Sequence, residues 1–282
     1  MVDHSIKRYF FCYAALLISI LFSCHLGNRK KHPLADSVAL LKNIAYLNRG
    51  FKSIHVFVAL CDNKYQGIVP VPPKLGNGQD PDNNLYWGSS FGVGTFFKKS
   101  NDWELIKKQK GNDTLLERLV FRSKTAKYYL VADAYDGKYI KKTTIDFLSS
   151  CAGRLKDTLH FGHLVIGIAG NAALLAYIGH DGLMDFHLHP QFSNKDGQVR
   201  DGIVLACDSK AYFEPFLQDS KARTLLLTTG LMCPEAYTLH DAIQGYVRSE
   251  SAESVRLRAV AAYNKYQKCG FQFADKLLVL GN

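Results

Sequence analysis

Two short apolar segments in the second half of the chain each end in a side chain that can do chemistry. Residues 172–178, Ala-Ala-Leu-Leu-Ala-Tyr-Ile, lead through Gly179 to His180. Residues 202–206, Gly-Ile-Val-Leu-Ala, lead to Cys207. Such segments are typical of buried strands in a parallel sheet, where reactive groups lie at the carboxyl ends of the strands. A thiol and an imidazole at two such ends can act as nucleophile and general base. The alternative is that both occupy ordinary strand-end turns and never meet.

The residues beside this pair are candidates to complete a hydrolase site. A cysteine hydrolase needs donors for an oxyanion and a group that orients the imidazole. The backbone N–H groups of Gly182 and Cys207 are candidate oxyanion donors. Asp181 and Asp208 are candidates to orient the imidazole or to line a pocket. A helix is expected after Cys207, and its positive end would favour the thiolate.

Strands alternate with helices along the remaining chain. We expect strands at residues 54–60, 103–108, 117–121, 127–134, 203–206 and 223–228, and one or two more between 164 and 178. We expect helices at residues 34–47, 85–99, 140–152, 211–217, 234–247 and 254–268. This alternation predicts a three-layer α/β/α sandwich with a mainly parallel sheet. The segment 64–84 is rich in Gly, Pro, Asn and Asp, and its length indicates a functional or mobile loop.

The two strand ends also resemble a known family. In the caspase-like cysteine peptidases, including the legumain-, clostripain- and gingipain-type branches, one strand ends in His-Gly. A later strand ends in Ala-Cys, often followed by a small or acidic residue and Ser. Residues 205–209, Leu-Ala-Cys-Asp-Ser, resemble the second motif, and residues 179–182, Gly-His-Asp-Gly, resemble the first. Here Asp181 separates the His from the Gly. The order of the expected elements from residue 54 to residue 247 is similar to that of the family.

This resemblance implies a caspase-like domain over residues 34–282, with Cys207 as nucleophile and His180 as general base. It implies a peptide or protein substrate and no cofactor. It also implies that the loop starting at Asp62 and Asn63 helps to form the specificity pocket. The alternative is a binding protein instead of an enzyme: a non-catalytic member of the family, in which the loop after these residues binds a polymer or a partner protein.

A third possibility is a metal-dependent hydrolase. Asp185, His187 and His189 would share one face if their segment were a strand, and carboxylate with imidazole suits zinc or iron. The His-x-His-x-Asp-His pattern of metal-dependent hydrolases is absent, and Pro190 ends the segment. Our main interpretation therefore includes no metal.

The first 23 residues have the pattern of a secretory signal peptide. A Lys-Arg pair precedes the apolar residues 9–22, and Leu-Phe-Ser-Cys at 21–24 resembles a bacterial lipobox. The resemblance implies cleavage before Cys24, lipidation of its thiol, and a tether over residues 24–33. The apolar stretch is short for a membrane span of roughly 20 residues, and an uncleaved anchor is the alternative. We therefore expect a lipid-anchored protein of the bacterial cell envelope, on the periplasmic or outer-membrane side.

Charge and cysteine usage narrow the expected partners. The formal charge is +10, from 35 basic and 25 acidic residues, and it indicates affinity for anionic surfaces such as lipid headgroups. The basic residues are scattered without interleaved aromatics, so nucleic acid is not an expected partner. No Cys-x-x-Cys pair is present, which excludes the usual zinc and redox motifs. Removal of Cys12 and lipidation of Cys24 would leave an odd number of cysteines, so at least one thiol is free or pairs between molecules.

Overall fold

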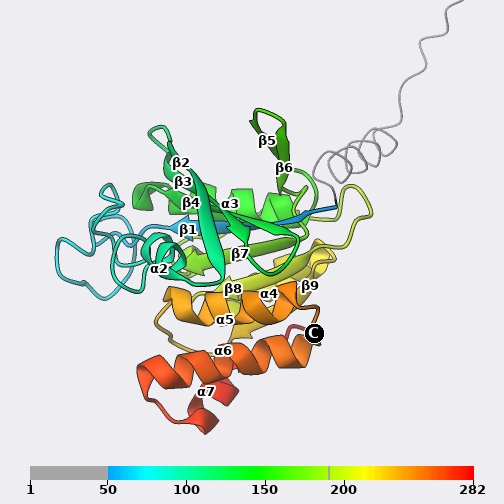
Figure 1. Ribbon diagram of the computed structural model, residues 1–282. Helices are drawn as coiled ribbons and strands as arrows, with labels where there is room; N and C mark the ends of the chain where they lie inside the picture. The colour runs from blue at the N-terminus through cyan, green and yellow to red at the C-terminus, as the bar shows by residue number, and fades with distance from the viewer. Residues whose placement is uncertain (1–49, 190) are drawn as a thin grey trace, which may run out of the picture. The chain divides into compact units, whose positions relative to one another are not determined.

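An eight-stranded sheet organises the part of the chain that the structure, a computed structural model, describes: residues 50–189 and 191–282 (Figure 1). In spatial order the strands are β10 (Leu278–Val279), β9 (Arg223–Thr228), β8 (Asp201–Leu205), β7 (Leu174–Gly179), β1 (Lys52–Ala59), β4 (Tyr128–Tyr135), β3 (Leu115–Ser123) and β2 (Trp103–Lys110). Neighbouring strands from β4 to β9 run parallel. The strands β2, β3 and β10 pair antiparallel with their neighbours. The expected α/β class with a large, mainly parallel sheet is confirmed.

Several predictions fall on residues outside the described ranges. These are the signal peptide at 1–23, the lipidated Cys24, the tether at 24–33, the helix at 34–47 and Pro190.

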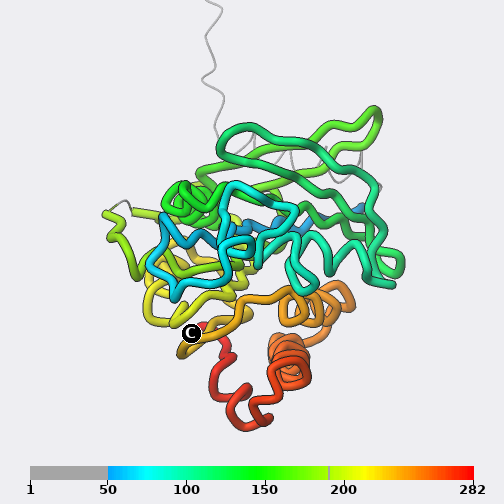
Figure 2. The backbone as a smooth tube through the Cα atoms, turned by 90° about the vertical axis from the view of Figure 1, so that its left-hand side faces the viewer, coloured from blue at the N-terminus to red at the C-terminus, as the bar shows by residue number. Residues whose placement is uncertain are grey.

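Helices cover both faces of the sheet. On one face lie α3 (Ile140–Cys151) and α4 (Ser209–Asp219), and on the other lie α2 (Val93–Lys99), α5 (Ala236–Val247) and α6 (Ala252–Gln267). A short α7 (Phe271–Leu277) packs against α6. Figures 1 and 2 both show α6 and α7, in orange and red, on the side of the sheet opposite the green α3.

Buried side chains of β1 alternate between two apolar cores, one on each face of the sheet. Ile54, Val56 and Val58 pack into the core beneath α5 and α6, whereas Phe57 and Ala59 pack beneath α3 and α4. Successive side chains of a strand point to opposite faces, so a strand covered on both sides is apolar throughout. The continuous apolar sequence of β1 is therefore what a central strand of a three-layer fold requires.

A hairpin of β5 (Lys156–Phe161) and β6 (Leu164–Ala169) packs over part of the sheet as a third cluster of apolar residues. The sequence left open whether residues 164–178 form one strand or two. They form two strands of different sheets, because the chain turns at Ala169, which has φ of +50°, and at Gly170.

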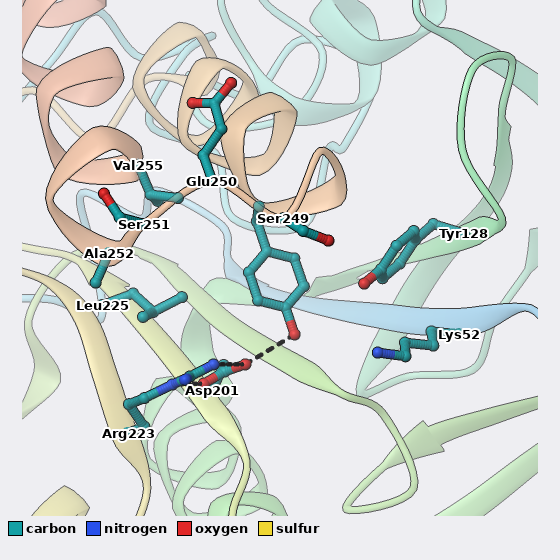
Figure 3. A pocket seen from close by; sticks show the side chains of 11 residues that line it. Lys52, Tyr128, Asp201, Arg223, Leu225, Ser249, Glu250, Ser251, Ala252 and Val255 are labelled. Atoms are coloured by element: carbon teal, nitrogen blue, oxygen red, sulfur yellow. Dashed lines mark hydrogen bonds and ion pairs between the residues drawn. The ribbon is translucent and has the colours of Figure 1, made fainter.

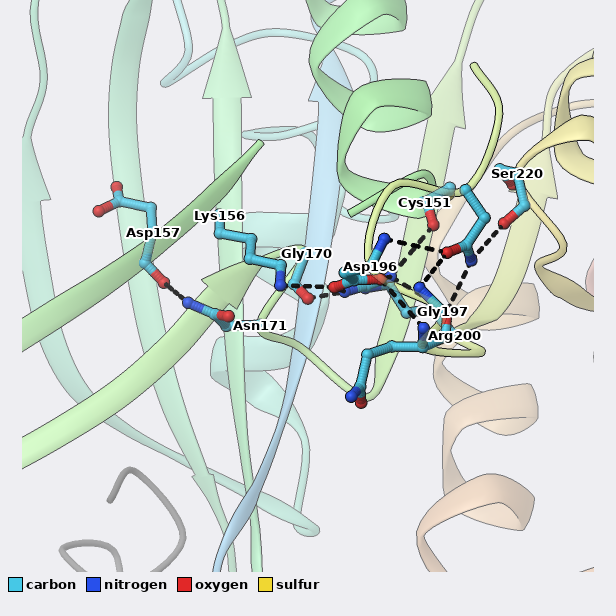
Figure 4. Close-up of polar contacts among 11 residues, drawn as sticks. Cys151, Lys156, Asp157, Gly170, Asn171, Asp196, Gly197, Arg200 and Ser220 are labelled. Atoms are coloured by element: carbon cyan, nitrogen blue, oxygen red, sulfur yellow. Dashed lines mark hydrogen bonds and ion pairs between the residues drawn. The ribbon is translucent and has the colours of Figure 1, made fainter. Parts of the chain in front are cut away.

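A buried ionic network fastens the loop that enters β8 (Figure 4). Asp196 Oδ2 lies 2.5 Å from Arg200 Nη2 and 2.5 Å from Lys156 Nζ, and Figure 4 shows Asp196 between these two bases. Arg200 Nε also donates to the carbonyl oxygen of Gly170 at 2.7 Å. Burial raises the pKa of Asp196, but the hydrogen bonds from Arg200 and Lys156 outweigh it and lower the pKa to about 2. The start of β8, the strand that leads to Cys207, is therefore firmly held.

The order of the parallel strands determines where a crevice forms. After β1 the chain forms the edge strand β2, comes back through β3 to β4 beside β1, and then crosses to the other side of β1 to build β7, β8 and β9. In open α/β sheets, ligands bind beyond the carboxyl ends of the strands where this order reverses. In this chain that point lies between the ends of β1 and β7.

Candidate functional site

A cavity of about 410 Å³ opens at the carboxyl ends of β7 and β8. His180 and Cys207 both line it. Its other walls come from the loop after β1, around Ile68 and Val71, and from the segment before α5, around Met232 and Pro234. The structure thus brings together the two reactive residues that the sequence placed at separate strand ends.

Cys207 lies in a tight turn between β8 and α4. The next residue, Asp208, adopts the left-handed conformation with φ of +47°, and α4 begins directly after it at Ser209. The N–H of Ser209 donates to Thr228 Oγ1 at 3.1 Å, and the N–H of Thr228 donates to Ser209 Oγ at 2.9 Å. Thr228 Oγ1 also donates to the carbonyl oxygen of Ala206. These bonds anchor the turn on β9 and fix the position of the thiol.

Several groups around the Cys207 thiol favour its neutral form. Burial raises its pKa, and the charges of Asp181 and Asp208 raise it further, while the backbone of Met232 lowers it. The sulfur accepts the Met232 N–H at 3.4 Å and donates to the Met232 carbonyl oxygen at 3.7 Å. The positive end of a helix favours a thiolate, whereas burial and the two carboxylates around Cys207 favour the neutral thiol. A base is therefore needed to make this sulfur a nucleophile.

His180 is held by the turn that follows β7. Gly179 has φ of +147°, and a Cβ there would lie 2.7 Å from the carbonyl oxygen of Ala59, so only glycine fits. The Tyr177 hydroxyl donates to the backbone carbonyl of His180 at 2.8 Å. The imidazole is buried, with 8% of its side chain exposed. The turn therefore presents the ring to the cavity in a restricted position.

The carboxylate that hydrogen-bonds the His180 ring is Asp185. Its Oδ2 lies 2.7 Å from His180 Nε2 and also accepts the N–H of Gly67 at 3.0 Å. The short 3₁₀ helix η2 (Gly182–Met184) turns the chain so that Asp185 returns to the ring. An ionised carboxylate only accepts, so the hydrogen of this bond is on Nε2; in the neutral imidazole the lone pair is then on Nδ1. Within the described ranges Nδ1 makes no hydrogen bond, and it is the nitrogen that can take a proton.

The sequence did not single out Asp185 for this role. From the sequence we expected Asp185 only as a potential metal ligand, and Asp181 and Asp208 as the groups that orient the imidazole. The signal that was present is an acid five residues after the histidine, with a glycine between them that allows a tight turn.

The other predicted residues at this end of the sheet have different surroundings. Asp181 is fully buried, its Oδ1 accepts the N–H of Leu183 at 2.9 Å, and its Oδ2 has no hydrogen-bond partner. Burial raises the pKa of Asp181 to about 7. A Cβ on Gly182 would meet the Phe186 ring at 2.8 Å, so this glycine packs against an aromatic side chain. The oxyanion and orienting roles of Asp181, Gly182 and Asp208 stay predictions.

Asp62 and Asn63 stabilise the loop that forms one wall of the cavity. Asp62 Oδ1 accepts the N–H of Lys64 at 2.8 Å. The Asn63 side chain donates to the carbonyl of Val71 at 2.7 Å and accepts the Val71 N–H at 3.0 Å. The residues of this loop that line the cavity lie further along it, from Gly67 to Val71. Asp62 and Asn63 therefore act on the pocket through the shape of the loop.

The described residues contain no group of three or more His, Cys, Asp and Glu side chains that could hold a metal ion. Residues 185–189 form no strand, so Asp185, His187 and His189 do not share a strand face as the metal alternative required. Asp185 instead hydrogen-bonds His180.

All five cysteines of the described ranges are free thiols. Burial raises the pKa of Cys61 to about 11 and that of Cys151 to about 12. Those two buried side chains behave as small apolar groups, whereas Cys207 and Cys233 line the cavity.

A second cavity, of about 330 Å³, lies at the opposite edge of the sheet (Figure 3). Asp201 there binds Arg223 at 2.5 Å and accepts a hydrogen bond from the Tyr246 hydroxyl at 2.8 Å. Figure 3 shows Lys52 and Tyr128 on one side of this cavity and Arg223 on the other. Its lining residues include neither His nor Cys, so it lacks the pair that the first cavity has.

Within residues 50–189 and 191–282, the structure contains no helix long and apolar enough to cross a membrane.

Comparison with known proteins gives no relative: no protein-family model, no curated protein sequence and no solved structure matches this chain.

Proposed function

We propose that this chain is a caspase-like cysteine peptidase in which Cys207 is the nucleophile and His180 is the general base. One observation carries the proposal. The two side chains line the same cavity at the carboxyl ends of adjacent parallel strands, and Asp185 binds His180 through Nε2, which leaves Nδ1 as the ring nitrogen without a hydrogen bond among the described residues. General-base activation requires a thiol and an imidazole that share one site, with a ring nitrogen that can take the thiol proton.

The fold supports the caspase-like part of the proposal. The motif residues lie on β7 and β8, which are neighbours in the sheet as well as successive strands of its parallel part. Helices cover both faces, and the switch point of the sheet lies beside β7. Membership of the caspase-like family is proposed from the resemblance at residues 179–182 and 205–209.

The proposed reaction is amide hydrolysis in two stages. His180 Nδ1 takes the thiol proton as Cys207 Sγ bonds to the substrate carbonyl carbon, and backbone N–H groups stabilise the oxyanion. The carbon–nitrogen bond then breaks, and the leaving amine takes the proton from His180. Water attacks the resulting thioester while His180 again removes a proton. The carboxylic acid leaves, and the proton returns to the Cys207 sulfur.

The proposal also includes anchoring of the protein to the bacterial envelope by a lipid on Cys24. Its support is the sequence pattern of residues 1–24, and the peptidase domain would then act on peptides or proteins at the membrane surface. Replacement Cys24→Ala should release the protein from the membrane fraction and abolish labelling by a radioactive fatty acid. Unchanged membrane association and labelling would contradict this part.

The test of the catalytic proposal is the Cys207→Ala variant, scored by cleavage of a peptide library. We expect turnover to fall at least about 10³-fold, as it does when the nucleophile of a catalytic pair is removed. The matched control is Cys269→Ala, because Cys269 is another free thiol and does not line the cavity. Equal turnover in the wild type and Cys207→Ala would contradict the proposal.

One observation favours the non-catalytic alternative, a caspase-like binding module. The Cys207 thiol is hydrogen-bonded to the backbone of Met232, and burial, together with the carboxylates of Asp181 and Asp208, raises its pKa. A wild-type protein that binds peptides, cleaves none, and leaves Cys207 unlabelled by substrate-like electrophiles would favour this alternative.

A further inference from the structure

We infer that the cavity beside Cys207 receives a large, uncharged apolar side chain of the substrate, such as Leu, Met or Phe. The inference rests on the proposed function, which identifies this side chain as the one next to the bond that is cleaved. It assigns the substrate class, which the sequence motifs do not give.

The walls of the cavity are apolar on every side. Ile68 and Val71 come from the loop after β1, Leu85 comes from the segment before α2, and Met232 and Pro234 come from the segment before α5. Pockets of about 300–1,000 Å³ with apolar walls and a few polar groups are typical ligand sites, and this cavity of about 410 Å³ falls in that range. Burial also raises the pKa of Tyr86, another lining residue, well above its usual value, so its hydroxyl is uncharged.

The charges around the cavity do not suit a charged side chain. Among the described residues that line it there is no Lys or Arg to pair with an acidic side chain. The single lining carboxylate is that of Glu235, and its Oε2 already accepts from the Tyr237 hydroxyl at 2.7 Å and from Gln267 Nε2 at 3.1 Å. A charge that leaves water without a partner loses its hydration at a large cost in free energy. The cavity therefore disfavours acidic side chains, and the two hydrogen bonds that already engage Glu235 Oε2 compete with its use as a partner for a basic side chain.

The rim of the cavity carries exposed apolar side chains as well. Val69 is 87% exposed, Leu231 is 72% exposed and Met184 is 42% exposed, and all three line the cavity. Exposed large apolar side chains that gather around a pocket indicate a surface that a partner covers. A peptide whose side chain enters the cavity would cover this rim with its neighbouring residues.

The test uses peptide amides that differ only in the residue before the cleaved bond: Leu, Met, Phe, Ala, Asp, Asn or Arg. We expect kcat/KM for Leu, Met or Phe to exceed that for Ala by about tenfold or more, since each methylene in an apolar pocket contributes a factor of about 10 to 200. Asp and Arg should be poorer than Ala. A preference for Asp, Asn or Arg would overturn the inference while leaving the peptidase proposal intact.

A matched pair of variants sharpens this test. Ile68→Asp introduces a carboxylate at the cavity wall and should reduce kcat/KM for Leu at least about tenfold while improving the relative rate for Arg. Val199→Asp introduces the same charge at an exposed valine, 68% exposed, that does not line the cavity, and should change neither rate. Equal effects of the two variants on the Leu peptide would contradict the assignment of the cavity.

The two proposals fail in distinguishable ways. If the wild type cleaves none of the peptides and Cys207 resists substrate-like electrophiles, the peptidase proposal is wrong. The affinity of the cavity for each of the same peptides is then measured by calorimetry with the Cys207→Ala variant. Tighter binding of the Leu peptide than of the Asp and Arg peptides supports an apolar cavity, and equal or weaker binding of the Leu peptide overturns it.

Discussion

Two histidines in this molecule donate through Nε2 to a carboxylate, yet their surroundings differ at Nδ1. His55, in β1, lies with Nε2 2.9 Å from Asp133 Oδ2, and its Nδ1 accepts the N–H of Ala169 at 3.0 Å. Asp133 is also bound by Arg118 through two hydrogen bonds of 2.6 Å. Every polar atom of this buried imidazole has a partner, so it stabilises the fold and has no atom left for catalysis.

His180 has the same kind of carboxylate partner and a different second nitrogen. Its Nε2 lies 2.7 Å from Asp185 Oδ2, its Nδ1 makes no hydrogen bond within the described residues, and it lines a cavity with Cys207. The Asp185 side chain is 27% exposed, whereas that of Asp133 is fully buried. A His–Asp pair therefore does not by itself indicate a general base. The indication is a ring nitrogen without a hydrogen bond, on a histidine that lines a cavity.

Replacing each histidine by glutamine should give the largest effects, and should distinguish the catalytic role proposed for His180 from the structural role of His55. His180→Gln should reduce kcat by about 10²–10⁴-fold, the usual contribution of a general base, with little change in the unfolding temperature. His55→Gln should lower the free energy of unfolding by about 1–3 kcal/mol, because it disturbs buried hydrogen bonds, while the folded fraction keeps its activity. Peptide turnover and urea unfolding measure the two effects. An inactive but fully stable His55→Gln protein would contradict the comparison.

Removing the charge of Asp133 should produce the largest loss of stability. Asp133→Asn leaves the Arg118 guanidinium without its buried partner, and we expect a loss of about 3–5 kcal/mol at pH 7. Burial raises the pKa of Asp133, but its interactions with His55 and Arg118 outweigh burial and lower the pKa below the ordinary value.

This lowered pKa of Asp133 gives the prediction a pH dependence. Its contribution to stability is present above the unfolded pKa of about 3.9 and is lost as the pH falls through the folded pKa. Urea unfolding at pH 7 and pH 3 should show a smaller difference between the wild type and Asp133→Asn at pH 3. A constant difference would count against this account of the ionic cluster.

Asp185 is a positioning residue, and its replacement should have an intermediate effect. Asp185→Asn weakens one charge-assisted hydrogen bond to His180, a contribution of about 1.5–3 kcal/mol, so we expect kcat to fall about 10- to 10²-fold. KM and the unfolding temperature should stay near their wild-type values, because Asp185 does not bind the substrate side chain. A rise in KM with kcat retained would show that Asp185 acts on binding and not on the orientation of the base.

Asp181→Asn should have the smallest effect on reactivity. The charge of Asp181 adds to the effect of burial in raising the pKa of Cys207, so its removal should speed alkylation of Cys207 at pH 8. Burial also raises the pKa of Asp181 itself to about 7, so the wild type loses stability as the pH rises from about 4 to 7, and the variant should lose less. Alkylation rates and urea unfolding at pH 5 and pH 8 measure both. Identical pH dependence of the two proteins would contradict the buried-carboxyl account.

The central strands could be predicted because their apolar sequences are continuous and end in turn residues. Residues 223–228 form β9 as expected, and the expected strand at 203–206 is β8 with a shift of one or two residues. The helix expected at 85–99 is wrong over its first half, since α2 begins at Val93. The carbonyl oxygen of Asn84 accepts the N–H groups of Trp87, Gly88 and Ser89, and these tight turns replace the helix.

Prediction of the site was limited by contacts that depend on the fold. Strand-end position identified His180 and Cys207, and the parallel sheet explains why they line one cavity. The bond from His180 to Asp185 depends on the 3₁₀ turn between them, which the hydrophobic pattern does not reveal. The apolar wall combines residues around 68, 85 and 232, which lie far apart in the sequence.

The most direct test of the Cys207–His180 pair is labelling by a peptidyl acyloxymethyl ketone with Leu next to the reactive group. The inhibitor alkylates an activated sulfur with loss of its carboxylate, and mass spectrometry identifies the cysteine that carries the adduct. The pair predicts one adduct, on Cys207, and a labelling rate at least about 10²-fold lower in His180→Gln than in the wild type. Equal rates in the two proteins, or an adduct on Cys233 or Cys269 instead, would contradict it.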